Sequence, residues 1–166
     1  MVHAMRKALK NEKGLTLIEL LAVVVILGII AAIAIPAIGG IIDNSKKDAH
    51  AANAIQMIHS AKIAAAGDSK ARPEPNGKLF ISLLWLETNG YIDKMQDPDK
   101  GKDGYTREGT VADPSDKDPK VSAVEVTASK TGSLTYKVSL FNDKRGVGGK
   151  GTSYVEEDKV AREEVK

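Results

Sequence analysis

The sequence predicts an α+β protein, in which a long kinked amino-terminal helix, its first half transmembrane, packs on a small antiparallel β-sheet head. Three observations support this prediction. An aliphatic run fills residues 15–35, a helical stripe of small and apolar residues continues to residue 66, and two segments of alternating residues occupy 120–129 and 134–143. The part beyond the apolar run is about the size of one small domain.

The composition excludes several kinds of functional site. The chain has no cysteine, so it can form neither a disulfide nor a cysteine metal site. Its histidines, His3, His50 and His59, show no metal-ligand spacing, and we therefore expect no zinc site, no catalytic triad and no enzymatic activity. The net charge of +2 comes from residues 1–14, which carry a net +3, so the nearly neutral remainder offers no electrostatic footprint for nucleic acid.

The aliphatic run is long enough to cross a membrane. Residues 15–35 are interrupted only by Thr16, Glu19 and Gly28, and a helix of this length spans about 31 Å. A helix is expected because every backbone polar group must be satisfied within lipid. The basic cluster precedes the run, which predicts that residues 1–14 stay in the cytoplasm and that the chain after Pro36 is exported.

Three interpretations of this segment are open. It can be a permanent single-pass anchor, or a secretory signal peptide removed near Ala32 and Ala34. The third interpretation starts from Glu19, because a carboxylate inside a membrane is costly and usually marks a function with a charged partner. Gly14 lets a protease approach the backbone closely. A cut after Gly14 would create an amine on Leu15, one helical turn from Glu19, within a chain or between adjacent chains.

The stretch KGLTLIELLAVVVILGIIAAIAIP, residues 13–36, resembles the class III signal and amino-terminal helix of type IV pilins and pseudopilins. The resemblance covers about residues 6–60. It implies cleavage after Gly14 by a prepilin peptidase, N-methylation of Leu15, and a role for Glu19 in neutralising the terminal amine of a neighbouring subunit. Leu15 replaces the common phenylalanine, which bears on the efficiency of methylation. The lack of cysteine fits a Gram-positive-type or cysteine-free branch, and translation from Met5 would give a leader of more typical length.

The resemblance divides the chain into four parts. Residues 1–14 form a cleaved basic leader, 15–36 the transmembrane and filament-core helix, 37–66 its amphipathic continuation, and 67–166 a globular head with a charged tail. Pro36, Gly39 and Gly40 weaken the helix, and one alternative is that it ends there. The stripe through residues 51–65 favours its resumption, with a stop near Gly67. Together with Gly28, these weak points would let the helix stretch or melt in a filament.

The head is expected to contain one short helix and a small sheet. Residues 70–78 form a polar linker, and Leu79 to Leu86 read as a short buried helix closed by Asn89-Gly90, with Trp85 in the core. Strands are predicted over residues 120–129 and 134–143, joined by a hairpin loop at 131–133, and a third near 152–156. We expect His50 and His59 on the surface, because no carboxylates surround them in the sequence.

Two acidic segments are weak candidates for a calcium site. Positions 1, 3, 7 and 12 of a would-be loop hold Asp97, Asp99, Asp103 and Glu108. Lys102 stands where such a loop needs glycine, so a solvated turn is the favoured interpretation, and we expect no cofactor. The resemblance keeps calcium as an alternative, since major pseudopilins of type II secretion bind it in their heads. The second candidate comprises Asp113, Asp116 and Asp118.

The resemblance predicts a structural subunit, a major pilin, that is held in the cell membrane and then polymerised into an extracellular type IV pilus-like filament. Its expected partners are identical subunits, the prepilin peptidase, the pilus assembly platform and a cytoplasmic ATPase. The alternatives are a pseudopilin of a type II secretion or competence system, or a membrane-anchored or secreted binding protein. A role in DNA uptake would have to use the basic turn with Lys144, Arg145 and Lys150, which we interpret as a solvated loop.

Overall fold

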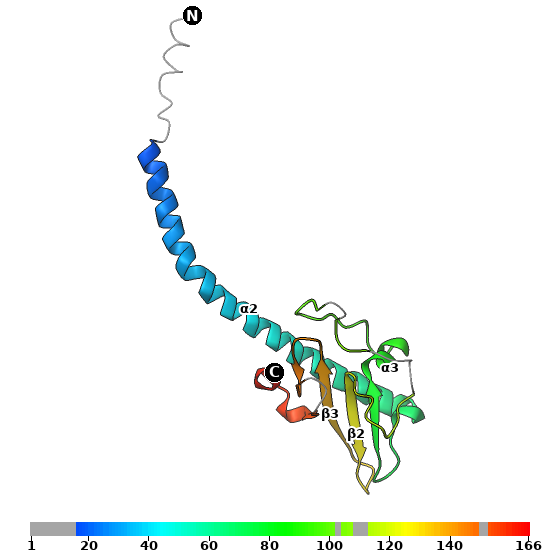
Figure 1. The fold of residues 1–166 in the computed structure, drawn as a ribbon. Helices are drawn as coiled ribbons and strands as arrows, with labels where there is room; N and C mark the ends of the chain where they lie inside the picture. Colours follow the sequence, from blue (N-terminus) through cyan, green and yellow to red (C-terminus); the bar gives the residue numbers. More distant parts are fainter. Residues whose placement is uncertain (1–15, 102–103, 108–112, 150–152) are drawn as a thin grey trace, which may run out of the picture. The chain divides into compact units, whose positions relative to one another are not determined.

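A computed structural model describes residues 16–101, 104–107, 113–149 and 153–166. The elements follow in the order α2 (Leu17–Gly67), η1 (Ser69–Ala71), β1 (Lys78–Ser82), α3 (Leu83–Thr88), β2 (Ala123–Ala128), β3 (Leu134–Phe141), β4 (Gly146–Val147), β5 (Val155–Glu156), η2 (Glu157–Lys159) and η3 (Arg162–Glu164) (Figure 1). The chain divides into two compact units, residues 1–42 and 43–166, and α2 contributes to both. The predicted α+β class is confirmed.

Helix α2 continues without a break through Pro36, Gly39 and Gly40. The alternative that the helix ends at the proline is therefore wrong. A proline removes one backbone donor, and the aliphatic and small residues on both sides keep the remaining turns helical. The helix ends at Gly67, one residue beyond the predicted end.

The first half of α2 has no protein cover among the described residues. Every large apolar side chain from Leu17 to Ile42 is between 51% and 85% exposed. An 18-residue window of the helix reaches a mean hydropathy of 3.0. By length and composition this part of α2 can cross a membrane, where a helix satisfies its own backbone groups.

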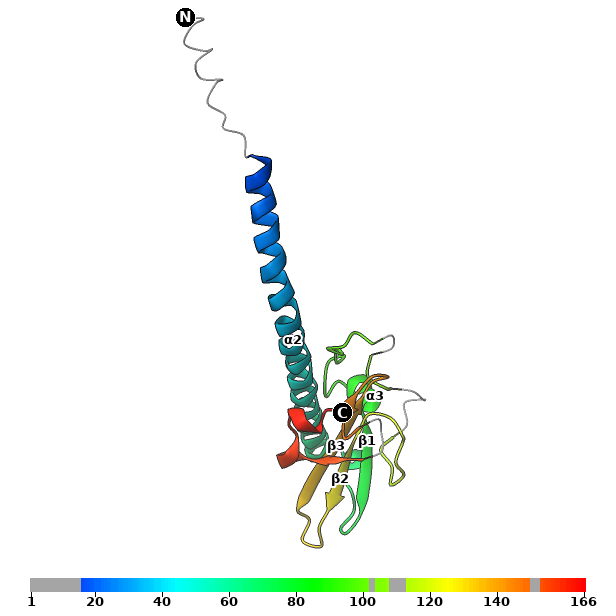
Figure 2. The same ribbon diagram turned by 60° about the vertical axis from the view of Figure 1, so that its left-hand side comes forward.

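The second half of α2 forms one layer of the head core. Its buried residues follow helical spacing and are mostly small: His50, Ala51, Ala54, Met57, Ile58, Ser60, Ala61, Ala64 and Ala65. The sheet supplies the opposing valines and leucine, namely Val124, Val126, Val138 and Leu140. Small side chains on the helix let the sheet approach closely, and Figure 2 shows the strands beside this end of α2.

The sheet is antiparallel and built around β3. The strand order is β1-β2-β3-β4, and β5 also pairs with β3. The register places Val126 opposite Tyr136 and Val124 opposite Val138. The strands predicted within residues 120–129 and 134–143 and near 152–156 are confirmed. Strand β4 was not predicted, and it lies inside the basic turn that was expected to be a solvated loop. A Cβ at Gly146 would lie 2.2 Å from the Phe141 Cβ, so this close approach requires glycine.

The helix predicted from Leu79 is partly wrong, because residues 78–82 form β1 and only residues 83–88 are helical. Phe80 and Ile81 are large β-formers that the β2 ladder buries. Ser82 marks the change, because its hydroxyl caps the helix by accepting from the Trp85 N–H. The predicted stop is confirmed at Gly90, where φ is +74°. Trp85 is buried, as predicted, and stacks on Tyr91 at 5.4 Å.

Two isoleucines on α2 test this packing directly. Ile58 is wholly buried in the head core, whereas Ile63 is 62% exposed on the same helix. Ile58→Ala should lower the free energy of unfolding by about 2–4 kcal/mol, because it removes core contacts and leaves a cavity. Ile63→Ala should be neutral or slightly stabilising, because alanine favours helix.

The measurement is urea unfolding of the full chain in non-ionic detergent, followed through the fluorescence of its one tryptophan. Equal effects of the two substitutions would contradict the described core.

Candidate functional site

The start of α2 is a capping box formed by Thr16 and Glu19. The Glu19 Oε2 accepts hydrogen bonds from the Thr16 N–H at 2.8 Å and from the Thr16 hydroxyl at 2.7 Å. In return, the Glu19 N–H donates to the Thr16 Oγ1 at 3.3 Å. This reciprocal arrangement satisfies helix-terminal donors and fixes the side chain of Glu19. The other oxygen, Oε1, has no partner among the described residues.

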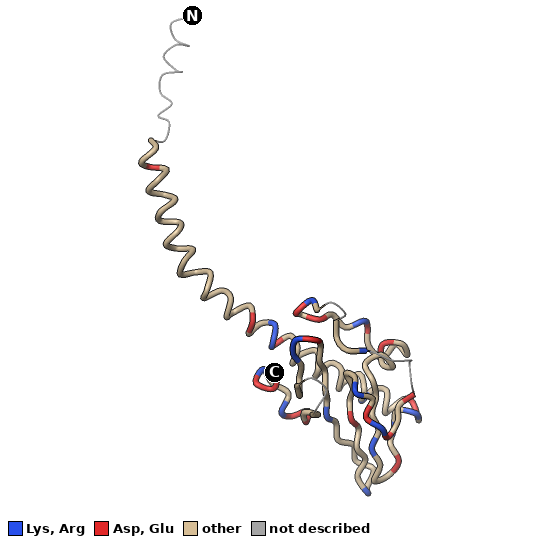
Figure 3. Tube along the Cα trace, viewed as in Figure 1, with Lys and Arg blue, Asp and Glu red and all other residues tan. Residues whose placement is uncertain are grey.

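Glu19 is the only charged residue between Leu15 and Ile42. Figure 3 shows this as a long uncharged stretch with a single acidic position near its start. Gly14 and Leu15, the predicted cleavage residues, lie outside the described residues. Gly28, Gly39 and Gly40 lie within α2, and a Cβ built at any of them meets no atom within 4 Å.

A second polar site, the His50 cluster, lies wholly within residues 43–166. It comprises His50 of α2, Asp97, Asp99 and Tyr105 of the segment after α3, and Arg145 of the turn between β3 and β4. The His50 Nε2 lies 3.1 Å from the Asp99 Oδ2 and 3.8 Å from the Asp97 Oδ1. Its Nδ1 lies 2.9 Å from the Tyr105 hydroxyl. The cluster therefore joins three segments that are distant in the sequence.

A chain of hydrogen bonds runs from Asn53 through Tyr105 and His50 to Asp99. The Asn53 side-chain amide donates to the Tyr105 hydroxyl at 2.9 Å. That hydroxyl is hydrogen-bonded to the His50 Nδ1, and the His50 Nε2 is hydrogen-bonded to the carboxylate of Asp99. Burial raises the pKa of Tyr105, which keeps the hydroxyl protonated as this chain requires.

Arg145 supplies the main countercharge in the His50 cluster. Its Nε lies 2.9 Å from the Asp99 Oδ2, and its terminal nitrogen lies 2.8 Å from the Asp43 Oδ1. Lys46 adds a longer contact of 3.6 Å to Asp99. Burial alone would raise the pKa of Asp99, but the His50 hydrogen bond and the Arg145 charge outweigh it, so the pKa is lowered.

Asp97 organises the backbone of its own loop. Its two oxygens accept from the N–H groups of Asp99 and Gly101 and from the Asn142 side-chain amide, at 2.8 to 3.0 Å. The Asn142 Oδ1 accepts in turn from the N–H of Arg145 at 2.7 Å. The carboxylate thus ties the loop after α3 to the turn that carries Arg145.

The predicted calcium ligands are only partly described. The structure brings Asp97 and Asp99 together, with His50 as a third group whose ligand atom lies within 4.8 Å of theirs, whereas Asp103 and Glu108 lie outside the described residues. Each of the three described groups already has hydrogen-bonding partners, and Arg145 occupies the place of a cation. This described set does not fit calcium, which prefers several free oxygen ligands. For the complete loop, the solvated turn stays the favoured prediction and calcium binding the alternative.

The other sequence candidates separate in space. Asp113 pairs with Lys70 at 2.9 Å, and Asp118 accepts from the Tyr154 hydroxyl at 2.9 Å, so these two carboxylates face different partners. In the basic turn, Arg145 is committed to the His50 cluster, and Lys150 lies outside the described residues. The part of this turn that the structure describes forms no free cluster of cations that could bind nucleic acid.

The prediction that His50 lies on the surface is wrong, whereas His59 is exposed as predicted. Asp97, Asp99 and Tyr105, which contact His50, lie about 50 positions away in the sequence. The charge pattern around His50 therefore does not predict these contacts. One signal was available: His50 stands next to Ala51 and one turn before Ala54, which places it at the edge of the buried stripe.

Asp99→Asn tests the electrostatics of the His50 cluster. At pH 7 the variant should lose about 3 kcal/mol of unfolding free energy, because Arg145 and Lys46 lose a buried anionic partner. The pKa of Asp99 is lowered in the folded state, so its stabilisation is present above the ordinary carboxyl pKa and is lost as pH falls through the folded value.

The difference between variant and wild type should therefore shrink below about pH 4 in urea titrations. Asp116→Asn, at an exposed position with no described ion pair, is the control and should have little effect. A difference that stays constant with pH would show that the charge of Asp99 is not responsible.

The amino-terminal region matches a known family model. Residues 9–35 match the prokaryotic N-terminal methylation motif, a range that contains Gly14, Leu15 and the Thr16–Glu19 capping box. No curated protein and no solved structure matches the chain. The motif marks a substrate of prepilin peptidase, and the apolar half of α2 is consistent with membrane anchoring. The amino-terminal region is thus that of a type IV pilin-like protein with a class III signal peptide.

Proposed function

We propose that the protein is a structural subunit, a major pilin, that is cleaved after Gly14, methylated on Leu15 and polymerised into an extracellular type IV pilus-like filament. Before assembly it is held in the cell membrane by the first half of α2. The assembly platform and a cytoplasmic ATPase act on it there, and the final partners are identical subunits. The protein acts by packing and performs no catalysis.

The observation that carries this proposal is the position of Glu19. It is one helical turn beyond the processing site, in a helix half that is otherwise uncharged and has no cover from described residues. Its Oε2 is held by Thr16, while Oε1 remains available. A terminal amine on Leu15, of the same or a neighbouring chain, is the partner that would satisfy this carboxylate in an apolar bundle.

The glycines of α2 support assembly through this helix. Gly28, Gly39 and Gly40 have open space where a Cβ would stand, so the fold of the single chain does not require glycine there. Each costs helix stability relative to alanine. Close helix–helix contact in lipid or in a filament favours small residues, and local extension near Pro36 needs weak turns. Both properties suit a subunit that leaves the membrane to join a bundle.

A pseudopilin of a type II secretion or competence system would share the same signal and helix. The head has its own core and an antiparallel sheet, which are compatible with either role, so the filament itself must decide between them. Electron microscopy of surface filaments, with identification of the main subunit, distinguishes the two. Abundant long fibres made of this chain support the proposal, and its occurrence only as a minor component contradicts it.

Gly14→Val tests processing. The β-branched side chain should block close approach of the peptidase, so the leader stays attached and no filaments form. Intact mass and amino-terminal sequencing of the membrane fraction measure this. Ala8→Val, which makes the same kind of change inside the leader, is the control and should be processed normally. A Gly14→Val protein that starts at Leu15 would contradict the proposed cleavage.

Glu19→Ala and Glu19→Gln together test the charge. The glutamine retains an oxygen that can accept from Thr16, so it preserves the capping bond while removing the negative charge. Both variants should be cleaved and remain in the membrane, and both should give far fewer filaments in shearing assays and micrographs. Normal filament yield from Glu19→Gln would show that capping, and not charge, is the role of this residue.

A further inference from the structure

Part of strand β3 has a neighbour on one side only. The strand pairs with β2 along residues 134–139. On its other edge, β4 pairs with Leu140 and Phe141, and β5 pairs with Lys137 and Val138. Among the described residues, nothing pairs with residues 134–136 at that edge. This three-residue segment, here called the open edge, continues the line of β5, which ends where η2 begins.

The hydrogen-bond pattern shows where the backbone of the open edge points. The Ala128 N–H donates to the residue before β1, so the even-numbered residues of β2 face β1 and its odd-numbered residues face β3. Because Thr127 lies opposite Thr135, the odd-numbered residues of β3 face β2. Leu134 and Tyr136 therefore direct their N–H and C=O groups away from β2, toward the open edge.

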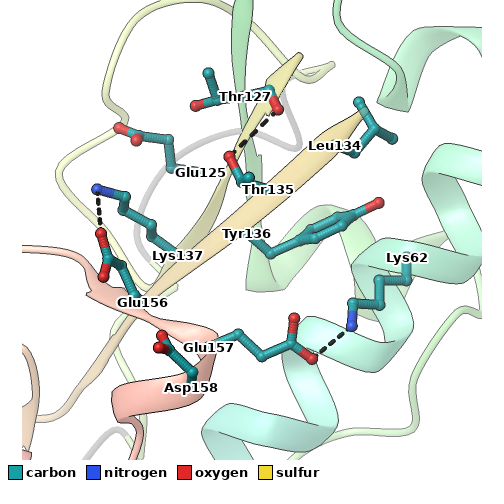
Figure 4. Close-up of a pocket in the computed structure, with 10 residues that line it drawn as sticks. All are labelled: Lys62, Glu125, Thr127, Leu134, Thr135, Tyr136, Lys137, Glu156, Glu157 and Asp158. Carbon is teal, nitrogen blue, oxygen red and sulfur yellow. Dashed lines mark hydrogen bonds and ion pairs between the residues drawn. The ribbon is translucent and has the colours of Figure 1, made fainter. Parts of the chain in front are cut away.

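A groove of about 800 Å³ lies along this edge (Figure 4). Its lining includes Leu134 and Tyr136, and Tyr136 points to the helix side, where the Lys62 Nζ lies 5.4 Å from its ring. The lining also includes Thr135 and Lys137, which point to the opposite face. Because residues from both faces of β3 line it, the groove lies beside the backbone edge of the strand. The side chains of an added strand would also alternate between the two faces, so the groove suits such a strand.

The groove is acidic. Besides two lysines, its lining carries four carboxylates, from Glu125, Glu156, Glu157 and Asp158. Glu157 pairs with Lys62, and Glu156 pairs with Lys137 at 3.3 Å and with Lys159, which is outside the lining. Glu125 and Asp158 have no ion pair with a described residue. The two carboxylates in excess favour an occupant with basic side chains.

We propose that this groove is a docking site for an extended basic peptide segment of another protein, which adds as a strand to the open edge of β3. Main-chain hydrogen bonds to Leu134 and Tyr136 supply the affinity, and lysine or arginine side chains beside Glu125 and Asp158 supply the preference. The open edge spans about 10 Å, which matches three residues of an added strand. The inference concerns the head alone and does not depend on leader cleavage.

The test uses the full chain, labelled with nitrogen-15, in non-ionic detergent. The probe is the acetylated, amidated peptide Lys-Val-Lys-Val-Lys, and the readout is the chemical shift and hydrogen exchange of the Leu134 and Tyr136 amides. Both amides should shift, and exchange at Tyr136 should slow about tenfold or more at saturation. The same peptide with its central amides N-methylated, and an acidic counterpart with glutamate for lysine, should produce neither effect.

Two variants of the chain complete the design. Leu134→Pro removes one donor at the open edge, where a strand tolerates proline, and should abolish protection at Tyr136. Glu125→Gln combined with Asp158→Asn should weaken binding several-fold at low salt, whereas Glu163→Gln, outside the groove, should not. If Leu134→Pro fails to fold, the N-methylated peptide on the unaltered chain decides the question.

Equal binding of the N-methylated or acidic peptide would overturn the proposal, because strand addition and charge preference would then be absent. Protection of Tyr136 without any peptide, increasing with protein concentration, would also overturn it, since the occupant would then be a second copy of the chain.

Discussion

One helix must be stable in two environments, and the rest of the structure follows from this constraint. The first half of α2 exposes almost only aliphatic side chains, while the second half forms a layer of the head core. Apolar surface that none of the described residues covers requires lipid or other helices. A single carboxylate in that half, at Glu19, makes the requirement specific, because it favours surroundings that also contain a positive charge.

The head must be stable without disulfide bonds, because the chain has no cysteine. Its core combines small residues of α2 with valines of the sheet, and the His50 cluster fixes the loops around that core. Arg145 supplies the countercharge of Asp99, whereas Asp97 accepts hydrogen bonds from two backbone N–H groups and the Asn142 amide. These contacts hold the loop after α3 and the turn between β3 and β4 in one arrangement.

The sequence predicted the features that depend on local pattern. Helix α2 could be predicted from the apolar run and from the helical stripe after Pro36. Strands β2 and β3 could be predicted from their alternating residues. The motif around Gly14 and Glu19 was recognisable because its residues have a fixed spacing. Features that depend on distant partners were not predictable. Burial of His50 arises from Asp99 and Tyr105, and β1 was mistaken for helix because its strand character comes from pairing with β2. The short strand β4 likewise depends on distant partners, namely β3 and the backbone of residues 164–166.

The central claim is that a newly exposed amine on Leu15 finds Glu19 within a bundle of identical helices. Cryo-electron microscopy of filaments sheared from the cell surface, combined with the intact mass of their subunit, tests it most directly. The account predicts fibres of a chain that begins at residue 15 with one added methyl group, with the Glu19 carboxylate beside a terminal nitrogen. A full-length, unmethylated protein that remains single in the membrane and never forms fibres would contradict it.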